Sequence, residues 1–230
     1  MQAQALRFDK QIVKTVRLDY LLWVPHDDDA AQPRPLILFL HGSGERGDNV
    51  RQVLNDGLPR RLANGLALPA IVAAPQCPAA SDWTLHDDAL VALLDDLAAA
   101  YAIDQNRVYL TGLSMGARET WRLACANPQR FAAVVAICGR RPYGLRSEED
   151  AALISHIPIW VFHGARDEVV PIEESNRMVA ALRRYGADVR YTVYPDAGHD
   201  AWTEAYAEAE LYPWLFAQRR RQAPMGDASE

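Results

Sequence analysis

The chain has 230 residues, of which 50% are hydrophobic and 23% are charged, a balance typical of one globular domain with a core of useful size. Its formal net charge of −6 argues against nucleic acid as a partner, because phosphate binding needs a basic face. Three cysteines are too few for a disulfide framework, and we expect them to be reduced.

The first ten residues and the lengths of the apolar runs indicate the cellular location to expect. Residues 1–10 contain no apolar run, so no secretory signal is predicted. The longest apolar runs, Pro35–Leu40 and Phe131–Cys138, are too short to cross a bilayer. Together with the unpaired cysteines, this favours the cytoplasm. We expect a single domain over residues 1–216 and a flexible polar tail over residues 217–230.

Short apolar runs alternate with amphipathic stretches along most of the chain. Runs rich in Val, Ile, Leu and aromatic residues predict strands at 12–24, 36–40, 70–74, 107–111, 131–138, 158–162 and 189–194. Apolar residues at helical spacing predict helices at 50–64, 85–101, 114–126, 172–185 and 201–216. Gly57 and Pro59 are candidate breaks in the first helix. This alternation indicates an α/β fold, with a mainly parallel central sheet and helices on both faces.

In such sheets the active groups lie in loops that follow the carboxyl ends of the strands. One of these loops, directly after the strand at 107–111, reads Gly112-Leu113-Ser114-Met115-Gly116. This is a G-x-S-x-G motif in the strand–turn–helix setting that a nucleophilic serine requires. The turn strains the serine backbone, and the flanking glycines leave room for neighbouring chain. Ser114 is therefore the predicted nucleophile; the alternative is a glycine-rich turn that ends in a helix-capping serine.

A serine nucleophile needs a base, usually histidine. In this architecture the chain order is serine, acid, histidine. His199 lies after the last strand and before the last helix, so it is the predicted base. We expect His163 to pack beneath the site, and His156 to lie at the opposite edge of the sheet because it precedes a strand.

The predicted acid is Asp167, just past the end of the strand at 158–162. A carboxylate at this position can orient the imidazole of the base. Glu168 is the nearest competitor and is expected to face solvent. Asp196 and Asp200 lie too close to His199 in the chain to orient its ring easily.

These elements resemble the α/β-hydrolase superfamily. The loop His41-Gly42-Ser43-Gly44-Glu45-Arg46-Gly47 is similar to the His-Gly loop of the phospholipase/carboxylesterase group, and within it to small esterases and predicted peptidases. Their Gly-His-Asp-x-Trp-Thr-x-x-Tyr segment is matched over residues 198–206, and the resemblance covers about residues 15–216.

The resemblance implies an oxyanion hole made of two backbone N–H groups. These would come from Ser43 and Met115, and they would face the oxygen that gains charge. His41 would then shape the loop rather than act as a base. Glu45, Arg46 and Asp48 are candidates to brace it by hydrogen bonds.

The connection Gly139–Ile157 decides how open the pocket is, because superfamily members that shield long apolar substrates usually insert a cap there. It has 19 residues, room for a loop and one short helix but no cap domain. An open pocket suited to short acyl groups is therefore expected. The candidates to line it are Leu113, Trp83, Tyr143 and Trp202.

The sequence predicts a serine hydrolase that cleaves small-molecule carboxylic esters through an acyl-enzyme. No metal site is predicted, because no His/Cys/Asp ligand spacing is seen, and no cofactor, because no phosphate loop or dinucleotide fingerprint is seen. A peptidase or acyl-aminoacyl hydrolase, a thioesterase and a cofactor-free perhydrolase would use the same triad. A binding protein on an inactive hydrolase scaffold is a further alternative, against which an intact triad argues.

Overall fold

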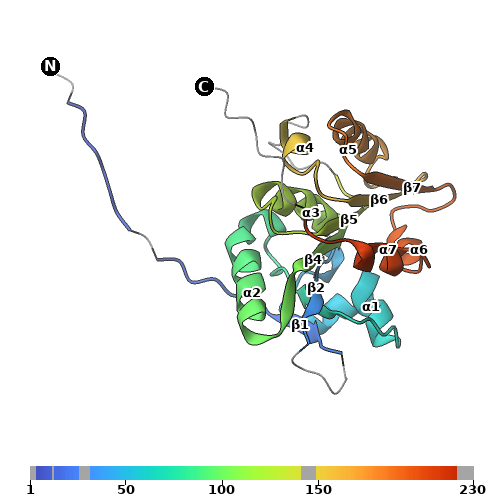
Figure 1. The fold of residues 1–230 in the computed structure, drawn as a ribbon, viewed down its shortest axis with the longest axis horizontal. Helices are drawn as coiled ribbons and strands as arrows, with labels where there is room; N and C mark the ends of the chain where they lie inside the picture. The colour runs from blue at the N-terminus through green and yellow to red at the C-terminus, as the bar shows by residue number, and fades with distance from the viewer. Residues whose placement is uncertain (1–3, 12, 26–31, 141–148, 222–230) are drawn as a thin grey trace.

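A computed structural model describes residues 4–11, 13–25, 32–140 and 149–221. Seven strands form one sheet in the order β1-β3-β2-β4-β5-β6-β7 (Figure 1). They are β1 (Tyr20–Trp23), β2 (Arg34–Leu40), β3 (Ile71–Pro75), β4 (Ile103–Leu113), β5 (Ala133–Ile137), β6 (Ile159–Gly164) and β7 (Val189–Tyr194). Every neighbouring pair is parallel except β1 with β3. The mainly parallel sheet predicted from the sequence is confirmed.

Helices cover both faces of the sheet (Figure 1). One face carries α2 (Asp87–Ala100), α3 (Met115–Ala126), α4 (Glu149–Leu153) and α5 (Glu173–Arg184). The other carries α1 (Gly57–Ala63), α6 (Trp202–Ala205) and α7 (Leu211–Ala217). The short 3₁₀ helices are η1 (Ser43–Glu45), η2 (Val50–Asn55) and η3 (Trp83–Leu85). The core is thus two apolar layers, and strands buried on both faces explain the continuous apolar runs.

Two predicted helices are each divided in the structure. The stretch 50–64 forms η2 and then α1, with a break before Gly57, whose φ is +63°. The stretch 201–216 forms α6 and α7. Pro213 explains the second break, because it has no N–H to donate to the carbonyl of Ala209 in a continuous helix.

The first strand is shorter than the predicted 12–24. In β1, Tyr20 lies opposite Pro75, which has no N–H for the ladder. One further bond, from the Gln76 N–H to the Asp19 carbonyl, ends the pairing. Before β1 the chain runs away from the body (Figure 1).

The connection after β5 contains one short helix, α4, in its described part, while residues 141–148 lie outside the described residues. No helix in the described ranges is long and apolar enough to span a bilayer. Of the predicted tail, residues 217–221 are described, and the Arg220 N–H donates to the Asn106 carbonyl.

Candidate active site

Ser114 occupies the turn between β4 and α3. Its backbone has φ 51° and ψ −114°, a conformation that costs a non-glycine residue about 1–3 kcal/mol. The turn is crowded: a Cβ on Gly116 would lie 2.0 Å from the Leu40 carbonyl oxygen, and a Cβ on Gly112 would lie 2.6 Å from the Gly116 backbone. Both glycines are therefore required where the motif places them, and Ser114 is held at the amino end of α3.

Three predicted residues from separate strand ends meet at this turn. His199 Nε2 lies 2.9 Å from Ser114 Oγ. His199 Nδ1 lies 2.7 Å from Asp167 Oδ2. Asp167 follows β6 and His199 follows β7. The arrangement allows a proton to pass from the hydroxyl to the imidazole, while the carboxylate orients the ring.

The Asp167 carboxylate is fully buried and well supplied with donors. Its Oδ1 accepts the N–H groups of Val169 at 2.9 Å and Val170 at 2.8 Å. Burial by itself would raise the pKa of Asp167, but the hydrogen bonds from His199 and from these two amides outweigh burial and lower that pKa. Asp167 is therefore ionised at neutral pH.

Two buried side chains support Asp167 from behind. His163 Nε2 lies 3.3 Å from Asp167 Oδ2 and 2.9 Å from the Val170 carbonyl, and its Nδ1 lies 2.7 Å from Ser175 Oγ. Cys138 follows β5 with φ 51° and is also fully buried. Burial raises the pKa of Cys138 to about 12, and a hydrogen bond with Asp167 adds to the effect. His163 thus packs beneath the site, as its position in the sequence indicated.

His41 shapes the loop that follows β2. It is 1% exposed, and its Nε2 accepts the Cys77 N–H at 2.9 Å. The ring proton is therefore on Nδ1, which donates to the Gly42 carbonyl at 2.6 Å. Burial lowers the pKa of His41 to about 4, so the ring stays neutral, and Trp83 Nε1 donates to the His41 carbonyl at 3.0 Å.

Further side chains tie the same loop to the end of β3. Gln76 Nε2 lies 2.8 Å from the Glu45 carbonyl and 2.9 Å from the Asn49 carbonyl. Arg46 donates to the carbonyls of Ser43 and Ser81, each at 3.1 Å. As predicted, Arg46 braces the loop; Glu45 is buried and braces it partly through its backbone.

The two predicted oxyanion donors border one cleft with the nucleophile. Ser43 begins η1 and Met115 begins α3, and first-turn N–H groups have no partner within their own helix. Both residues line the cleft that contains Ser114. Their role as oxyanion donors stays a prediction, consistent with this placement.

The cleft at Ser114 has a volume of about 350 Å³, and six of the nine residues that line it are polar or charged. Its lining consists of Ser43, Arg46, Asp82, Ser114, Met115, Arg118, Arg140, Val169 and Val170. Arg118 forms an ion pair with Asp82. No sequence motif identifies these arginines as pocket residues, although Arg118 lies one helical turn after Ser114 and so shares its face.

The four residues predicted to line the pocket lie in different places. Trp83 does not line this cleft: it is fully buried and anchors the His41 loop. Leu113 is 1% exposed and packs in the core rather than along the cleft. Trp202 is half-buried, and its ring meets that of His199 edge-on at 5.1 Å. Tyr143 lies outside the described residues.

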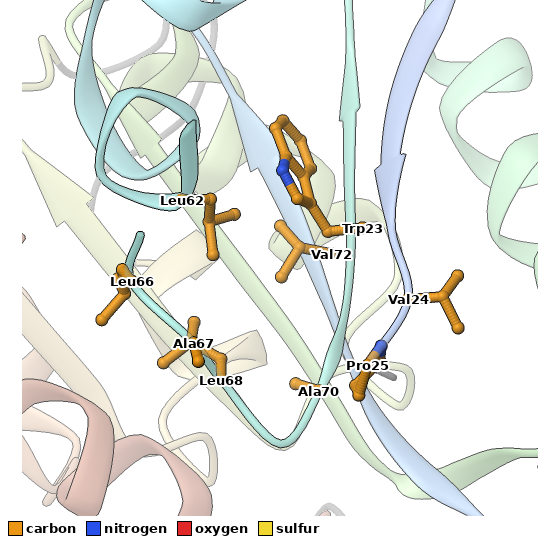
Figure 2. Close-up of a pocket in the computed structure, with 9 residues that line it drawn as sticks. All are labelled: Trp23, Val24, Pro25, Leu62, Leu66, Ala67, Leu68, Ala70 and Val72. Carbon is orange, nitrogen blue, oxygen red and sulfur yellow. The ribbon is translucent and has the colours of Figure 1, made fainter. Parts of the chain in front are cut away.

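A second pocket lies at the opposite edge of the sheet, beside the amino end of β3. It has a volume of about 420 Å³. Its lining is wholly apolar and includes Trp23, Leu62 and Val72, which face one another in Figure 2. Because this lining offers no group for acid–base chemistry, the Ser114 cleft is the candidate active site.

Comparison with known proteins assigns the family. The model of the dienelactone hydrolase family matches residues 80–212, a stretch that contains Ser114, Asp167 and His199. This chain belongs to the dienelactone hydrolase family. The family lies within the α/β-hydrolase superfamily, as the sequence predicted, and the phospholipase/carboxylesterase label is compatible but approximate.

Individual relatives agree with this assignment. A proposed carboxymethylenebutenolidase of Yersinia pestis is 33% identical over 72% of this chain and 55% of its own length. A proposed feruloyl esterase C of Aspergillus niger is 29% identical over 80% of this chain and 68% of its own length. This chain spans between 37% and 57% of the length of three curated relatives that it matches.

Two solved structures show the same fold. A thermostable esterase is 35% identical, with a TM-score of 0.74 over 87% of this chain and 59% of its own. A proposed dienelactone hydrolase of Klebsiella pneumoniae is 25% identical, with a TM-score of 0.61 over 86% of this chain and 89% of its own. The α/β-hydrolase fold predicted from the sequence is thereby confirmed.

Proposed function

We propose that this protein is a serine esterase with Ser114 as nucleophile, His199 as general base and acid, and Asp167 as the carboxylate that orients His199. One observation carries the proposal. Ser114, held in a strained turn, is hydrogen-bonded to His199 at 2.9 Å, and His199 is hydrogen-bonded to a buried carboxylate at 2.7 Å.

The geometry suggests how the reaction proceeds. Because Asp167 Oδ2 accepts the Nδ1 proton of His199, Nε2 is left as an acceptor for the Ser114 proton. Attack on the ester carbonyl then forms a tetrahedral oxyanion. The N–H groups of Ser43 and Met115 would stabilise it, each by about 3 kcal/mol. His199 gives the proton to the departing alcohol, and a water activated by His199 hydrolyses the acyl-enzyme.

The arginines that line the cleft favour a small ester that carries a negative group. Three arginines and one aspartate line the cleft, whose volume of about 350 Å³ suits a short acyl chain. The name carboxymethylenebutenolidase, borne by a relative, describes an enzyme for a cyclic ester with a carboxyl group, which agrees with this charge. Relatives named as feruloyl esterases also cleave esters by name, so ester hydrolysis is favoured over peptide or thioester hydrolysis.

The test compares Ser114→Ala with Ser155→Ala, a serine on an exposed turn near α4. Hydrolysis of aryl acetate and butyrate is measured together with covalent labelling by a fluorophosphonate. The wild type and Ser155→Ala should hydrolyse both esters and become labelled. Ser114→Ala should not be labelled, and its kcat should fall by about 10⁶-fold, the usual loss for a triad nucleophile. Hydrolysis or labelling that persists in Ser114→Ala would remove Ser114 from this role.

Substrate comparisons then separate the remaining alternatives. Matched amides and thioesters test the peptidase and thioesterase alternatives. An aryl hemisuccinate against an aryl butyrate tests the charge of the cleft at similar size. We expect the anionic ester to have the higher kcat/KM, and Arg118→Leu to reduce that preference. Equal values in the wild type would contradict the preference for an anionic ester but not the triad.

A further inference from the structure

Three side chains from neighbouring strand ends, the proposed base among them, form a compact cluster of metal-ligand atoms. Cys138 Sγ, a carboxylate oxygen of Asp167 and an imidazole nitrogen of His199 all lie within 4.8 Å of one another. The three residues follow β5, β6 and β7, which are adjacent in the sheet. They are far apart in the sequence, so ligand spacing along the chain does not reveal them.

The donor set suits one class of ion. Thiolate, imidazole and carboxylate are the ligands of Zn²⁺ and its thiophilic neighbours, whereas Mg²⁺ and Ca²⁺ take oxygen ligands. Zinc bonds of about 2.0–2.3 Å in a tetrahedral site place the ligand atoms roughly 3.3–3.7 Å apart. His199 Nδ1 and Asp167 Oδ2, now 2.7 Å apart, would have to separate by less than about 1 Å to admit the ion. The ligand atoms that lie up to 4.8 Å apart would have to approach one another by up to about 1 Å.

Of the three side chains, His199 is the one that would have to move to admit the ion. The Cys138 N–H donates to the Phe162 carbonyl, and Asp167 is held by the amides of Val169 and Val170. The side chains of Cys138 and Asp167 are fully buried, whereas the His199 side chain is 18% exposed. Two ligands are therefore fixed in the fold, and the third is partly exposed and lies against Ser114 Oγ.

We propose that Cys138, Asp167 and His199 form an inhibitory site for Zn²⁺ and related thiophilic divalent cations. The ion takes the place of the proton that His199 Nδ1 shares with Asp167. The consequence for activity rests on the proposed esterase function; the binding of the ion does not.

The protons balance as follows. In the free protein Cys138 carries its thiol proton and His199 carries a proton on Nδ1. When the ion binds, the thiol proton is released to solvent and a Zn–S bond forms. The Nδ1 lone pair binds the ion, and the imidazole proton moves to Nε2. A protonated Nε2 cannot accept the Ser114 proton, so acyl transfer stops.

The first experiment titrates Zn²⁺ into the full chain during hydrolysis of an aryl acetate. It compares the wild type with Cys138→Ser and with Cys125→Ser, which removes another buried thiol, on α3. Each rate is expressed relative to the same variant's metal-free rate. Cys138→Ser should need at least roughly ten times more Zn²⁺ for half-inhibition, the least that even an outer-shell partner is worth in a metal site. Cys125→Ser should match the wild type, and Mg²⁺ should not inhibit.

The second experiment needs no activity. Cd²⁺ bound to a thiolate gives an ultraviolet charge-transfer absorption, which should appear in the wild type, in Cys125→Ser and in Ser114→Ala. It should be lost in Cys138→Ser. Should that variant fail to fold, Cys138→Gly replaces it, because glycine adopts φ 51° without strain.

Two results would overturn the site: no Cd²⁺ absorption in the wild type, or Zn²⁺ inhibition that Cys138→Ser leaves unchanged. If the wild type shows the Cd²⁺ absorption but hydrolyses no ester, the metal site stands and the proposed function fails. If it hydrolyses esters but shows no absorption, the reverse holds.

Discussion

The two halves of the cleft are fixed in different ways. In the acid half, after β6, Asp167 is held by the N–H groups of Val169 and Val170 and by His163, all within four residues of it. In the other half, after β2, which would bind the oxyanion and which we call the oxyanion half, the His41–Asn49 loop is held by Gln76 and Trp83. Both of these residues lie beyond β3. The acid is positioned largely by its own segment, whereas the oxyanion loop depends on tertiary contacts.

Of the variants that test this comparison between the two halves, Asp167→Asn in the acid half has the largest expected effect. In Asp167→Asn an amide N–H₂ can face His199 Nδ1 in place of the carboxylate oxygen. Nδ1 then becomes the acceptor, and Nε2 carries the proton and cannot take the one from Ser114. We expect kcat to fall by about 10⁴-fold with little change in stability. Steady-state kinetics and thermal melting measure both, and a loss below about tenfold would mean that Asp167 does not set the tautomer.

The contrast also explains what the sequence could predict. The sequence can place Ser114 and Asp167 at strand ends because the turn motif and the segment after β6 carry their own geometry. The contact of the Trp83 indole with the His41 carbonyl cannot be predicted from the sequence, because nothing near residue 83 indicates it. Cys138 was overlooked because only the alignment of β5 beside β6 brings its thiol to Asp167. Sheet register and loop packing are properties of the whole fold, so they cannot be predicted from separate segments of the sequence.

The next largest effect breaks the oxyanion half. A Cβ on Gly42 would lie 2.8 Å from Leu113 Cδ1 and 3.6 Å from Ser114 Cβ. Gly42→Ala should therefore displace the neighbouring Ser43 N–H from the cleft and lower kcat by about 10²- to 10³-fold. Because this donor acts on the transition state, KM should change little.

Gly44→Ala is the matched control for this variant. A Cβ on Gly44 would meet no atom within 4 Å, so its kinetics should equal those of the wild type. If Gly42→Ala mainly raises KM, the loop contributes to substrate binding rather than to the oxyanion hole.

A smaller effect concerns the support under the oxyanion half. Arg122 donates to the Thr84 carbonyl, next to Trp83, and its Nε lies 3.0 Å from Oε2 of the fully buried Glu119. Arg122→Ala leaves that carboxylate without this guanidinium. The free energy of unfolding should fall by about 3 kcal/mol at alkaline pH.

The loss of stability in Arg122→Ala depends on pH through the protonation of Glu119. Burial raises the pKa of Glu119 to about 8, well above the value of about 4.3 in an unfolded chain. The folded state holds the proton more tightly, so the stability from this group is present at low pH and is lost as the pH rises toward 8. Chemical denaturation should show a greater loss for Arg122→Ala at pH 9 than at pH 5. In a Glu119→Gln background the two losses should be equal, and a larger loss at pH 5 would contradict the argument.

The smallest expected effect concerns acyl length and which half of the cleft holds the chain. Val169 contributes apolar surface on the acid side, while Arg46 and Arg118 line the other side. Each buried methylene stabilises by about 0.8 kcal/mol, or roughly fourfold in kcat/KM. In a cleft of about 350 Å³ the gain should continue from acetyl to butyryl esters and then level off.

Two variants test which side of the cleft holds the acyl chain. Val169→Ala keeps the N–H that binds Asp167 but removes apolar surface, so it should flatten this rise in kcat/KM. Arg118→Leu should shift the optimum to longer chains. A maximum at twelve carbons or more, or a rate that jumps at the micelle concentration, would reveal a hydrophobic tunnel or lid instead of a short open cleft.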